Sequence, residues 1–212
     1  MENKKKYITN GWLAVVIVAL ILIVDQIIKI EVKTNMTLGE AIRITDWFYI
    51  EFIENNGMAY GMTFFNKLVL SLFRTFAIGA ISWYIWRVVK TGIFSRGYVV
   101  CLAMILAGAA GNLIDCLFYG LIFDASTPFS VADFVPFGTG YSTFLHGKVV
   151  DMFYFPIIRT TYPDWVPMVG GDDFVFFSPI FNFADSCISV GVAVLLLFFR
   201  KDLEQMSLAW KK

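Results

Sequence analysis

The chain has 212 residues, of which 58% are hydrophobic and only 16% charged, and its mean hydropathy is +0.69. Soluble chains average about 25% charged residues, so this composition argues against an ordinary soluble domain and predicts a membrane protein. The 17 basic and 17 acidic residues balance, which argues against nucleic acid as a partner. The three cysteines lie in apolar runs without CxxC or Cys/His spacing, so we expect neither a disulfide framework nor a bound metal.

Four stretches have about 20 mainly apolar residues, enough for a helix to cross a bilayer. They cover approximately residues 12–30, 68–89, 98–119 and 180–199. The first follows Lys4–Lys6 but has no small-residue cleavage site after it, so we interpret it as an uncleaved anchor. Basic residues flank the N-terminus, the loop after the second stretch and the C-terminal tail. Because short basic loops remain in the cytoplasm, we expect both termini there.

This topology leaves two longer segments outside, residues 31–67 and 120–179. Aromatic and β-branched residues at 47–53, followed by the turn signal Asn55-Asn56-Gly57, predict a small strand or hairpin in the first. The second is rich in aromatic residues, glycine and proline, and we expect it to lie along the membrane surface. Residues 1–212 therefore form a single integral membrane domain, all-α apart from a small β element.

Polar residues in the predicted spans gather near their outer ends. They are Asp25 and Lys29 in the first span, Asn112 and Asp115 in the third, and Asn182 and Asp185 in the fourth. At about 1.5 Å per residue they lie within roughly 5–12 Å of the same surface. Ionisable groups at such a depth are unfavourable unless paired or hydrated, so their accumulation predicts a site.

Each element also has a structural interpretation. Asp25 and Lys29 are spaced i, i+4 and can neutralise each other, and Gly108–Asn112 is typical of close helix packing. Asn182 or Asp185 can cap the fourth helix. Two neighbouring carboxylates can share a proton and activate water for peptide hydrolysis. The same groups can carry protons in a transporter or simply hold a membrane scaffold together, and composition does not choose among these.

Five motifs, in order, resemble bacterial lipoprotein signal peptidase (signal peptidase II), a family of four-span membrane aspartyl proteases with a periplasmic β-cradle. They are Asp25-Gln26-Ile27-Ile28-Lys29, Asn55-Asn56-Gly57-Met58-Ala59-Tyr60-Gly61, Ala107-Gly108-Ala109-Ala110-Gly111-Asn112-Leu113-Ile114-Asp115, Gly147-Lys148-Val149-Val150-Asp151-Met152 and Phe181-Asn182-Phe183-Ala184-Asp185. The resemblance covers nearly the whole membrane scaffold.

The resemblance implies that Asp151 and Asp185 are the catalytic pair, one acting as general base on water and the other as general acid. It implies a prolipoprotein substrate that is cleaved before a cysteine bearing diacylglycerol, without metal or organic cofactor. The enzyme would be a monomer among the lipids of the bacterial inner membrane, with its active site near the outer face. The implied supporting residues are Asp25, Lys29, Asn55, Gly57, Ala59, Gly108, Asn112, Asp115, Asn182 and Ala184.

Two features depart from the family pattern. Cys116 stands where the family has arginine, and we hypothesise that Arg74 supplies the missing cation. The usual spacing after the third motif also points to Asp124, nine residues beyond Asp115, whereas Asp151 is 27 residues farther on. The local match and the apolar neighbours of Asp151 favour it over Asp124, because desolvation raises a carboxyl pKa as a proton-sharing pair requires.

Overall fold

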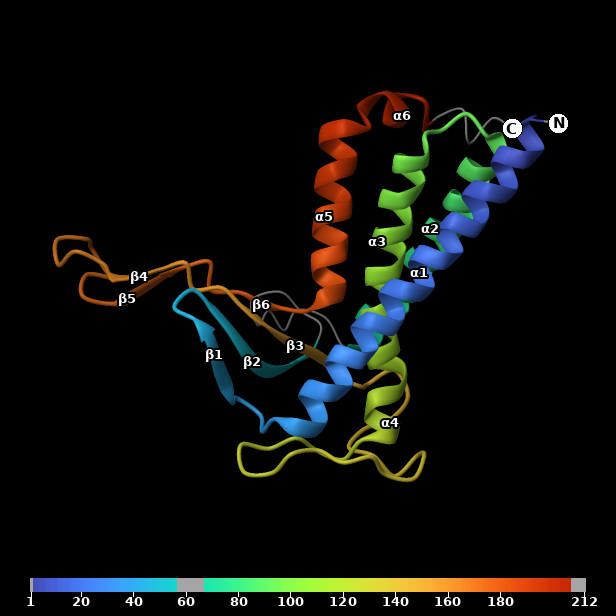
Figure 1. Cartoon of the computed structure of the whole chain (residues 1–212). Coiled ribbons are helices and arrows are strands. Elements are labelled where there is room, and N and C mark those ends of the chain that lie inside the picture. Colours follow the sequence, from blue (N-terminus) through green and yellow to red (C-terminus); the bar gives the residue numbers. More distant parts are fainter. Residues whose placement is uncertain (1, 57–66, 207–212) are drawn as a thin grey trace.

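The structure, a computed structural model, describes residues 2–56 and 67–206, with side chains from residue 9 onward. Long helices form a bundle, and a small sheet lies at the end of the bundle opposite α6 (Figure 1). The helical elements are α1 (Glu2–Asn35), α2 (Lys67–Thr91), α3 (Arg96–Ile114), a π-helical turn η2 (Asp115–Tyr119), α4 (Gly120–Ile122), α5 (Phe183–Phe198) and α6 (Arg200–Glu204). The strands are β1 (Ala41–Thr45), β2 (Phe48–Asn55), β3 (Val149–Tyr154), β4 (Ile158–Thr161), β5 (Asp173–Phe176) and β6 (Ile180–Phe181).

The central helix of the bundle is α3, which packs against α1, α2 and α5. Small residues permit the close approach of α3 to α5. A Cβ added to Gly108 would overlap the carbonyl oxygen of Ala184, and one added to Gly191 would lie 3.1 Å from the carbonyl oxygen of Cys101. The small-residue run of the third motif is therefore a packing surface, as its structural interpretation predicted.

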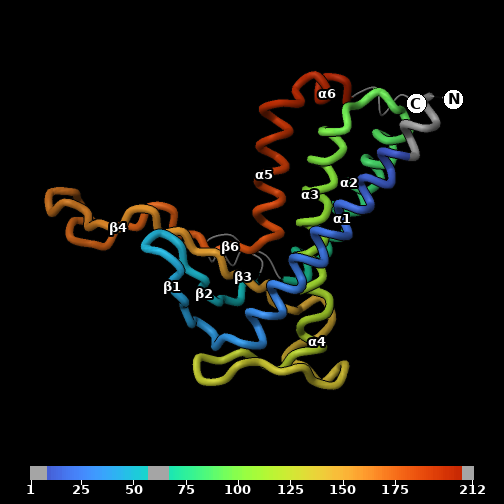
Figure 2. Tube along the Cα trace, viewed as in Figure 1, coloured from blue at the N-terminus to red at the C-terminus, as the bar shows by residue number. Residues whose placement is uncertain are grey.

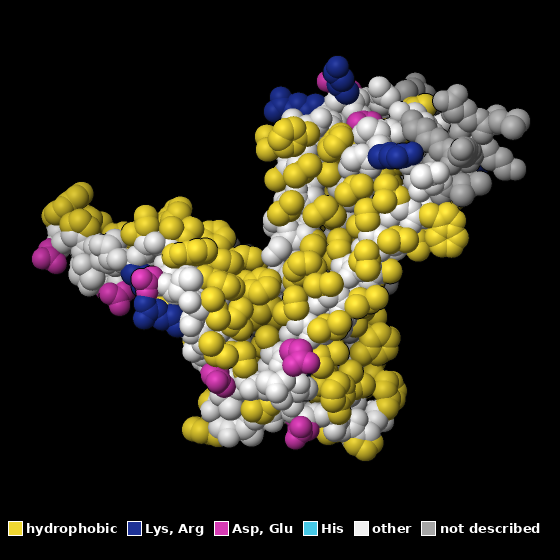
Figure 3. Space-filling view, viewed as in Figure 1, with side chains coloured by type: hydrophobic (Ala, Val, Ile, Leu, Met, Phe, Trp, Pro, Cys, Tyr) yellow, Lys and Arg dark blue, Asp and Glu magenta, His cyan; other side chains and the backbone are white. Residues whose placement is uncertain are grey.

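Three helical segments among the described residues are long and apolar enough to cross a membrane: Thr9–Asn35, Lys67–Thr91 and Arg96–Ile122. The apolar helix α5 has 16 residues and is shorter. Large apolar side chains of α1, α2 and α5 are exposed, including Trp12, Leu20, Phe73, Phe76 and Leu197. Hydrophobic side chains cover much of the visible face of the bundle (Figure 3). Such a surface is suited to lipid and not to water.

The strands build two antiparallel sheets in the described part of the chain. One has the order β1-β2-β3-β6, and the other is the β4–β5 hairpin. Figure 2 shows this hairpin as an arm that extends sideways from the bundle. The hairpin predicted within residues 31–67 is confirmed by β1 and β2.

A β-bulge in β2 determines which side chains share a face of the larger sheet. Ile50 pairs with Phe153 and Ile53 pairs with Asp151, so two residues of β2 oppose Met152. Paired residues point to the same face, so Ile50, Ile53, Phe153 and Asp151 lie together. Ile50 and Ile53 are three residues apart and would point to opposite faces of a regular strand, and the bulge places them on the same face.

Two boundaries and the content of one segment differ from the sequence-based expectation. α1 continues to Asn35, so the beginning of the expected outer segment 31–67 is helical. The fourth expected span, 180–199, begins as strand β6, and its helix starts only at Phe183 because Asn182 caps it. The segment 120–179 contains β3, β4 and β5, whose strands the glycine- and proline-rich composition did not reveal.

Candidate active site

A buried cation lies at the centre of the polar cluster. The Lys29 ammonium is 3.1 Å from Asp25 Oδ2 and 2.8 Å from Asp115 Oδ2, with all three side chains fully buried. It also donates to Asn112 Oδ1 at 2.9 Å. Lys29 therefore forms the predicted i, i+4 ion pair with Asp25 within α1, and it also binds Asn112 of α3 and Asp115. Such a pairing is required because an unpaired charge in this environment is strongly unfavourable.

Asp25 also fixes the start of α5. Its Oδ1 accepts a hydrogen bond from the backbone N–H of Ala184 at 3.0 Å. A Cβ on Gly111 would lie 2.6 Å from Asp25 Oδ2, so glycine at this position leaves room for the carboxylate. Asp25, Gly111 and Ala184 thus bring α1, α3 and α5 together at one point.

Asparagine side chains connect the two aspartates that the resemblance singles out. Asn112 Nδ2 donates to Asp185 Oδ1 at 2.7 Å. Asn182 Nδ2 donates to Asp151 Oδ1 at 2.6 Å and to Asn112 Oδ1 at 3.0 Å. Asn55 Nδ2 donates to Asp151 Oδ2 at 3.1 Å. Both carboxylates are therefore oriented by amide donors from different elements.

The local structure of each element explains these positions. Asn182 and Asp185 form a capping box at the start of α5, where the Asn182 side chain accepts from the Asp185 N–H at 2.9 Å. Asp151 lies in the centre of β3, on the face it shares with Ile53. Asp115 begins the π-helical turn and accepts the backbone N–H of Val150 through Oδ2 at 3.3 Å. The structural role of Asn182 as a cap is thus confirmed alongside its contact with Asp151.

The two aspartates differ in exposure. Asp151 is 1% exposed, whereas Asp185 is partly exposed. Burial, together with the nearby negative charge of Asp185, raises the pKa of Asp151 to about 7, although the amide donors of Asn55 and Asn182 act in the opposite direction. A carboxyl group that holds its proton near neutral pH beside a more accessible carboxylate can exchange protons with water and substrate.

Gln26 is a contributor to this cluster that the sequence did not single out. Its Nε2 donates to Asp115 Oδ1 at 3.0 Å and to Asp25 Oδ2 at 3.1 Å, and its Oε1 accepts from the Tyr119 hydroxyl at 3.1 Å. An amide within an apolar helix, directly beside Asp25, was the available signal.

Other predicted residues lie elsewhere. Asp124 is exposed in the loop after α4, where its Oδ1 accepts the Asp133 N–H at 2.8 Å. Arg74 donates from Nη1 to the Cys116 sulfur at 3.3 Å. Gly57 and Ala59 lie outside the described residues. Within residues 2–56 and 67–206, no group of three or more His, Cys, Asp or Glu residues could hold a metal ion.

The comparisons with known proteins agree on one family. The family model described as signal peptidase (SPase) II, Peptidase_A8, matches residues 17–200. The chain belongs to the signal peptidase II family. It is 46% identical to the lipoprotein signal peptidase of Porphyromonas gingivalis over 194 residues, which is 92% of this chain and 85% of that protein. It is 36% identical to the lipoprotein signal peptidase of Amoebophilus asiaticus, covering 89% of this chain and 78% of the relative.

Two solved structures of bacterial membrane enzymes have a similar fold. One has a TM-score of 0.61 at 21% identity and covers 90% of this chain and 88% of its own. The other has a TM-score of 0.60 at 22% identity, with 89% and 93% covered. As a member of the signal peptidase II family, the chain is a membrane-bound peptidase.

Proposed function

We propose that this chain is an aspartyl endopeptidase that removes signal peptides from diacylglyceryl-modified prolipoproteins, and that Asp151 and Asp185 are its catalytic pair. The observation that carries the proposal is the hydrogen-bonded chain Asp151–Asn182–Asn112–Asp185. It orients two carboxylates from β3 and α5 toward a common place. Relatives that carry the name lipoprotein signal peptidase support the choice of substrate.

In the proposed reaction, one carboxylate removes a proton from water, and the oxygen attacks the carbonyl carbon of the residue before the lipidated cysteine. The other aspartic acid then protonates the nitrogen of that cysteine as the C–N bond breaks. The products are a signal peptide with a new carboxylate and a mature chain with a free α-amino group. The raised pKa of Asp151 allows it to hold the proton that the leaving nitrogen requires.

Amide donors have a specific purpose in this scheme. Asn112 and Asn182 fix the directions of the carboxylate oxygens without adding a competing charge. Lys29, Asp25 and Asp115 hold α1 and α3 together behind them. Asn55, with Gly57 and Ala59, would border the cradle that receives the substrate peptide, and Gly108 and Ala184 allow the helices to approach closely.

An aromatic strip beside Asp151 suits a lipid-bearing substrate. Phe153 follows Asp151 on the same face of β3, about 6–7 Å farther along the strand, and Phe155 comes directly after the strand ends at Tyr154. Phe48 stacks on Phe155 with ring centroids 4.7 Å apart, and Phe155 stacks on Phe181 at 5.6 Å. Trp47 continues the strip at 6.1 Å from Phe155 and is 54% exposed. Aromatic side chains with partly exposed faces are typical of the membrane–water boundary, where the acyl chains of such a substrate would lie.

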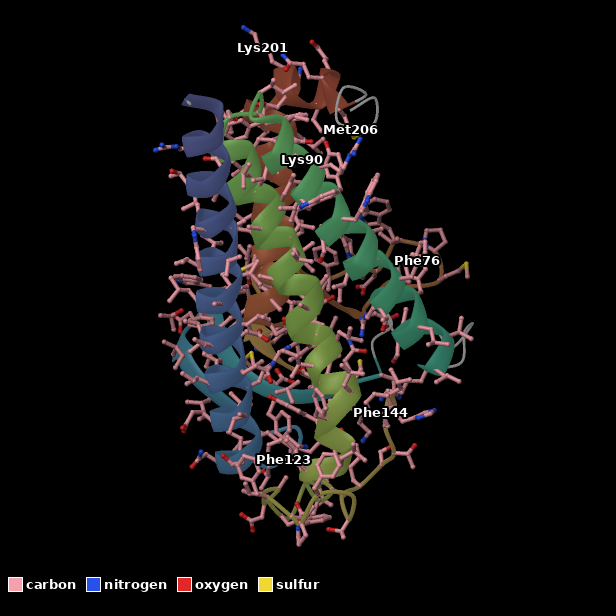
Figure 4. All side chains as sticks on the ribbon, turned by 90° about the vertical axis from the view of Figure 1, so that its right-hand side faces the viewer. Phe76, Lys90, Phe123, Phe144, Lys201 and Met206 are labelled. Atoms are coloured by element: carbon pink, nitrogen blue, oxygen red, sulfur yellow. The ribbon has the colours of Figure 1, made fainter. Side chains whose placement is uncertain are left out.

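The proposed topology has four spans, with α5 as the fourth. Lys90 and Lys201 lie at one end of the bundle and Phe123 at the other (Figure 4). Basic residues at the first end favour the cytoplasm for it and for both termini. The aspartates would then lie near the outer face of the inner membrane, and the segment between α4 and α5 along the membrane surface. We propose a monomer that contacts lipid, uses no cofactor and binds no nucleic acid.

The test is cleavage of a synthetic lipobox peptide bearing diacylglyceryl-cysteine by the purified protein in detergent. We expect Asp151→Asn and Asp185→Asn to abolish cleavage while Asp124→Asn, the matched control, cleaves at the wild-type rate. The same peptide without diacylglycerol should remain intact. A wild-type protein that cleaves nothing under conditions where an authentic peptidase is active would refute the proposal. Activity in Asp151→Asn with none in Asp124→Asn would reverse the assignment.

A further inference from the structure

A buried ionic bridge lies on the face of the sheet opposite Asp151. Glu54 Oε1 is 2.6 Å from Lys33 Nζ, and Glu54 Oε2 is 2.7 Å from Lys148 Nζ. Lys33 is fully buried, and the Glu54 side chain is 3% exposed. One carboxylate thus joins the end of α1 to the residue that precedes β3.

The loop after α4 closes this bridge from water. Ser126 Oγ is 2.8 Å from Lys33 Nζ and donates to Glu54 Oε1 at 3.1 Å. The Lys33 ammonium also lies 5.4 Å from the ring centre of Phe123 and 5.0 Å from that of Tyr141, within the range of cation–π attraction. Figure 4 shows Phe123 at the base of the bundle, below α3. Phe123, Ser126 and Tyr141 all lie in the segment between α4 and β3.

The bridge acts where β2 meets the catalytic strand. Glu54 pairs with Val150, and the next residue, Asn55, pairs with Val149 at the end of the ladder. Asn55 then donates to Asp151 Oδ2 at 3.1 Å. Because adjacent residues of a strand point to opposite faces, Glu54 is anchored below the sheet while Asn55 contacts the carboxylate above it. Holding Glu54 therefore fixes the backbone that aims Asn55.

We propose that Glu54, bridged by Lys33 and Lys148, is a positioning residue that sets the hydrogen bond between Asn55 and Asp151. The inference deepens the proposed function and rests on it for the catalytic role of Asp151. It also assigns a purpose to the segment between α4 and β3, whose Phe123, Ser126 and Tyr141 shield the bridge. Lys33 and Lys148 outweigh the effect of burial on Glu54 and lower its pKa, so the Glu54 carboxyl is ionised at neutral pH.

Losing Glu54 affects the pKa of Asp151 in two ways that act in opposite directions. The groups that act on Asp151 are Asp185 on α5, Lys29 on α1, and the amides of Asn55 and Asn182. Removing a negative charge from the neighbourhood would by itself lower the pKa of Asp151. Loss of the Asn55 donor would raise it, because that bond favours the ionised form.

The experiment measures the Asp151 pKa in the full-length protein by infrared titration of the protonated carboxyl band, with Asp151→Asn as the reference for subtraction. The variants form a double-mutant cycle of Glu54→Gln and Asn55→Ala. We expect Glu54→Gln to raise the pKa of Asp151 by about one unit, since a hydrogen bond to a charged group is worth about that much. When Asn55 is already replaced by alanine, Glu54→Gln should produce no further rise in the pKa of Asp151. Glu51→Gln, a control on the same strand that pairs with Ala41 of β1, should leave the pKa unchanged.

A lowered or unchanged pKa in Glu54→Gln, or an equal rise in both backgrounds, would overturn the inference. Because Glu54→Gln leaves Lys33 buried without its partner, the cycle is repeated with Lys33→Met and Glu54→Gln combined, for which the same results are expected. Infrared titration requires no turnover, so the outcome is independent of the peptide assay. If the wild-type protein does not cleave the lipidated peptide, the proposed function is refuted. If the pKa changes caused by Glu54→Gln and Asn55→Ala simply add in the double variant, only the role of Glu54 is refuted.

Discussion

Replacing Asp151 by asparagine should stabilise the protein, and more so as the pH rises. The pKa of this carboxyl is about 7 in the folded protein, against 3.8 for a free aspartate. The folded state therefore keeps a proton that the unfolded state loses between these two values. As the pH rises from about 3.8 to about 7, the carboxyl of Asp151 therefore lowers the free energy of unfolding of the wild type by an increasing amount. Above pH 7 this destabilisation stays constant. At about 1.4 kcal/mol per unit, the full penalty is about 4 kcal/mol.

The assay is thermal unfolding of wild type and Asp151→Asn in the same detergent at pH 5 and pH 8.5. Asparagine cannot accept from both Asn55 and Asn182 as the carboxylate does, but this loss is independent of pH. The informative quantity is the difference between the two pH values. We expect the variant to gain about 2–3 kcal/mol relative to wild type between pH 5 and pH 8.5, or roughly 5–10 °C in Tm for a chain of this size. Asp124→Asn is the exposed control. If the stability of Asp151→Asn relative to wild type is the same at pH 5 and pH 8.5, this result refutes the argument.

Three further substitutions test the cluster and its surroundings. Lys29→Met leaves two buried carboxylates without their shared cation, and should reduce the free energy of unfolding by about 3–5 kcal/mol; a Tm equal to that of wild type would contradict the pairing. Gly108→Ala places a methyl group against the carbonyl oxygen of Ala184 and should destabilise the packing of α3 on α5 by about 1–3 kcal/mol, measured by thermal unfolding. Arg74→Ala should slow peptide cleavage about ten- to hundredfold if Arg74 supplies the cation that Cys116 replaces, and Cys116→Arg in that background should restore the rate. An unaffected rate in Arg74→Ala would dismiss that role.

The sequence was informative about which polar residues meet, but less so about how they pair. The common depth of Asp25, Asn112 and Asp185 predicted one cluster, and the structure brings these side chains together. The spacing of Asp25 and Lys29 indicated a local pair. It could not indicate that Lys29 also binds Asp115, because that contact depends on how α1 packs against α3.

Apart from the β1–β2 hairpin, the strands were the least predictable part of the fold. β3 reads Val149-Val150-Asp151-Met152-Phe153-Tyr154, and its first four residues are buried on both faces. A strand covered on both sides lacks the alternation of apolar and polar residues that identifies half-buried strands. The position of Gln26 beside Asp25 in an apolar helix indicates a polar contact, but not that one of its partners is Asp115, which the packing of the helices determines.

The bulge in β2 makes one strand serve two purposes that can vary separately. The residues after it align Asn55 with Asp151, and those before it place Phe48 and Ile50 beside Phe153. In the proposed function, in which the aromatic strip contacts the substrate, substitutions in the first half of β2 alter which acyl chains or peptides are accepted without disturbing the hydrogen bonds of the carboxylates. Deleting a single residue at the bulge would leave both halves on the same side of the sheet, because Ile50 and Ile53 would then be two positions apart, but it would remove the bend and the extra twist that the bulge gives to β2.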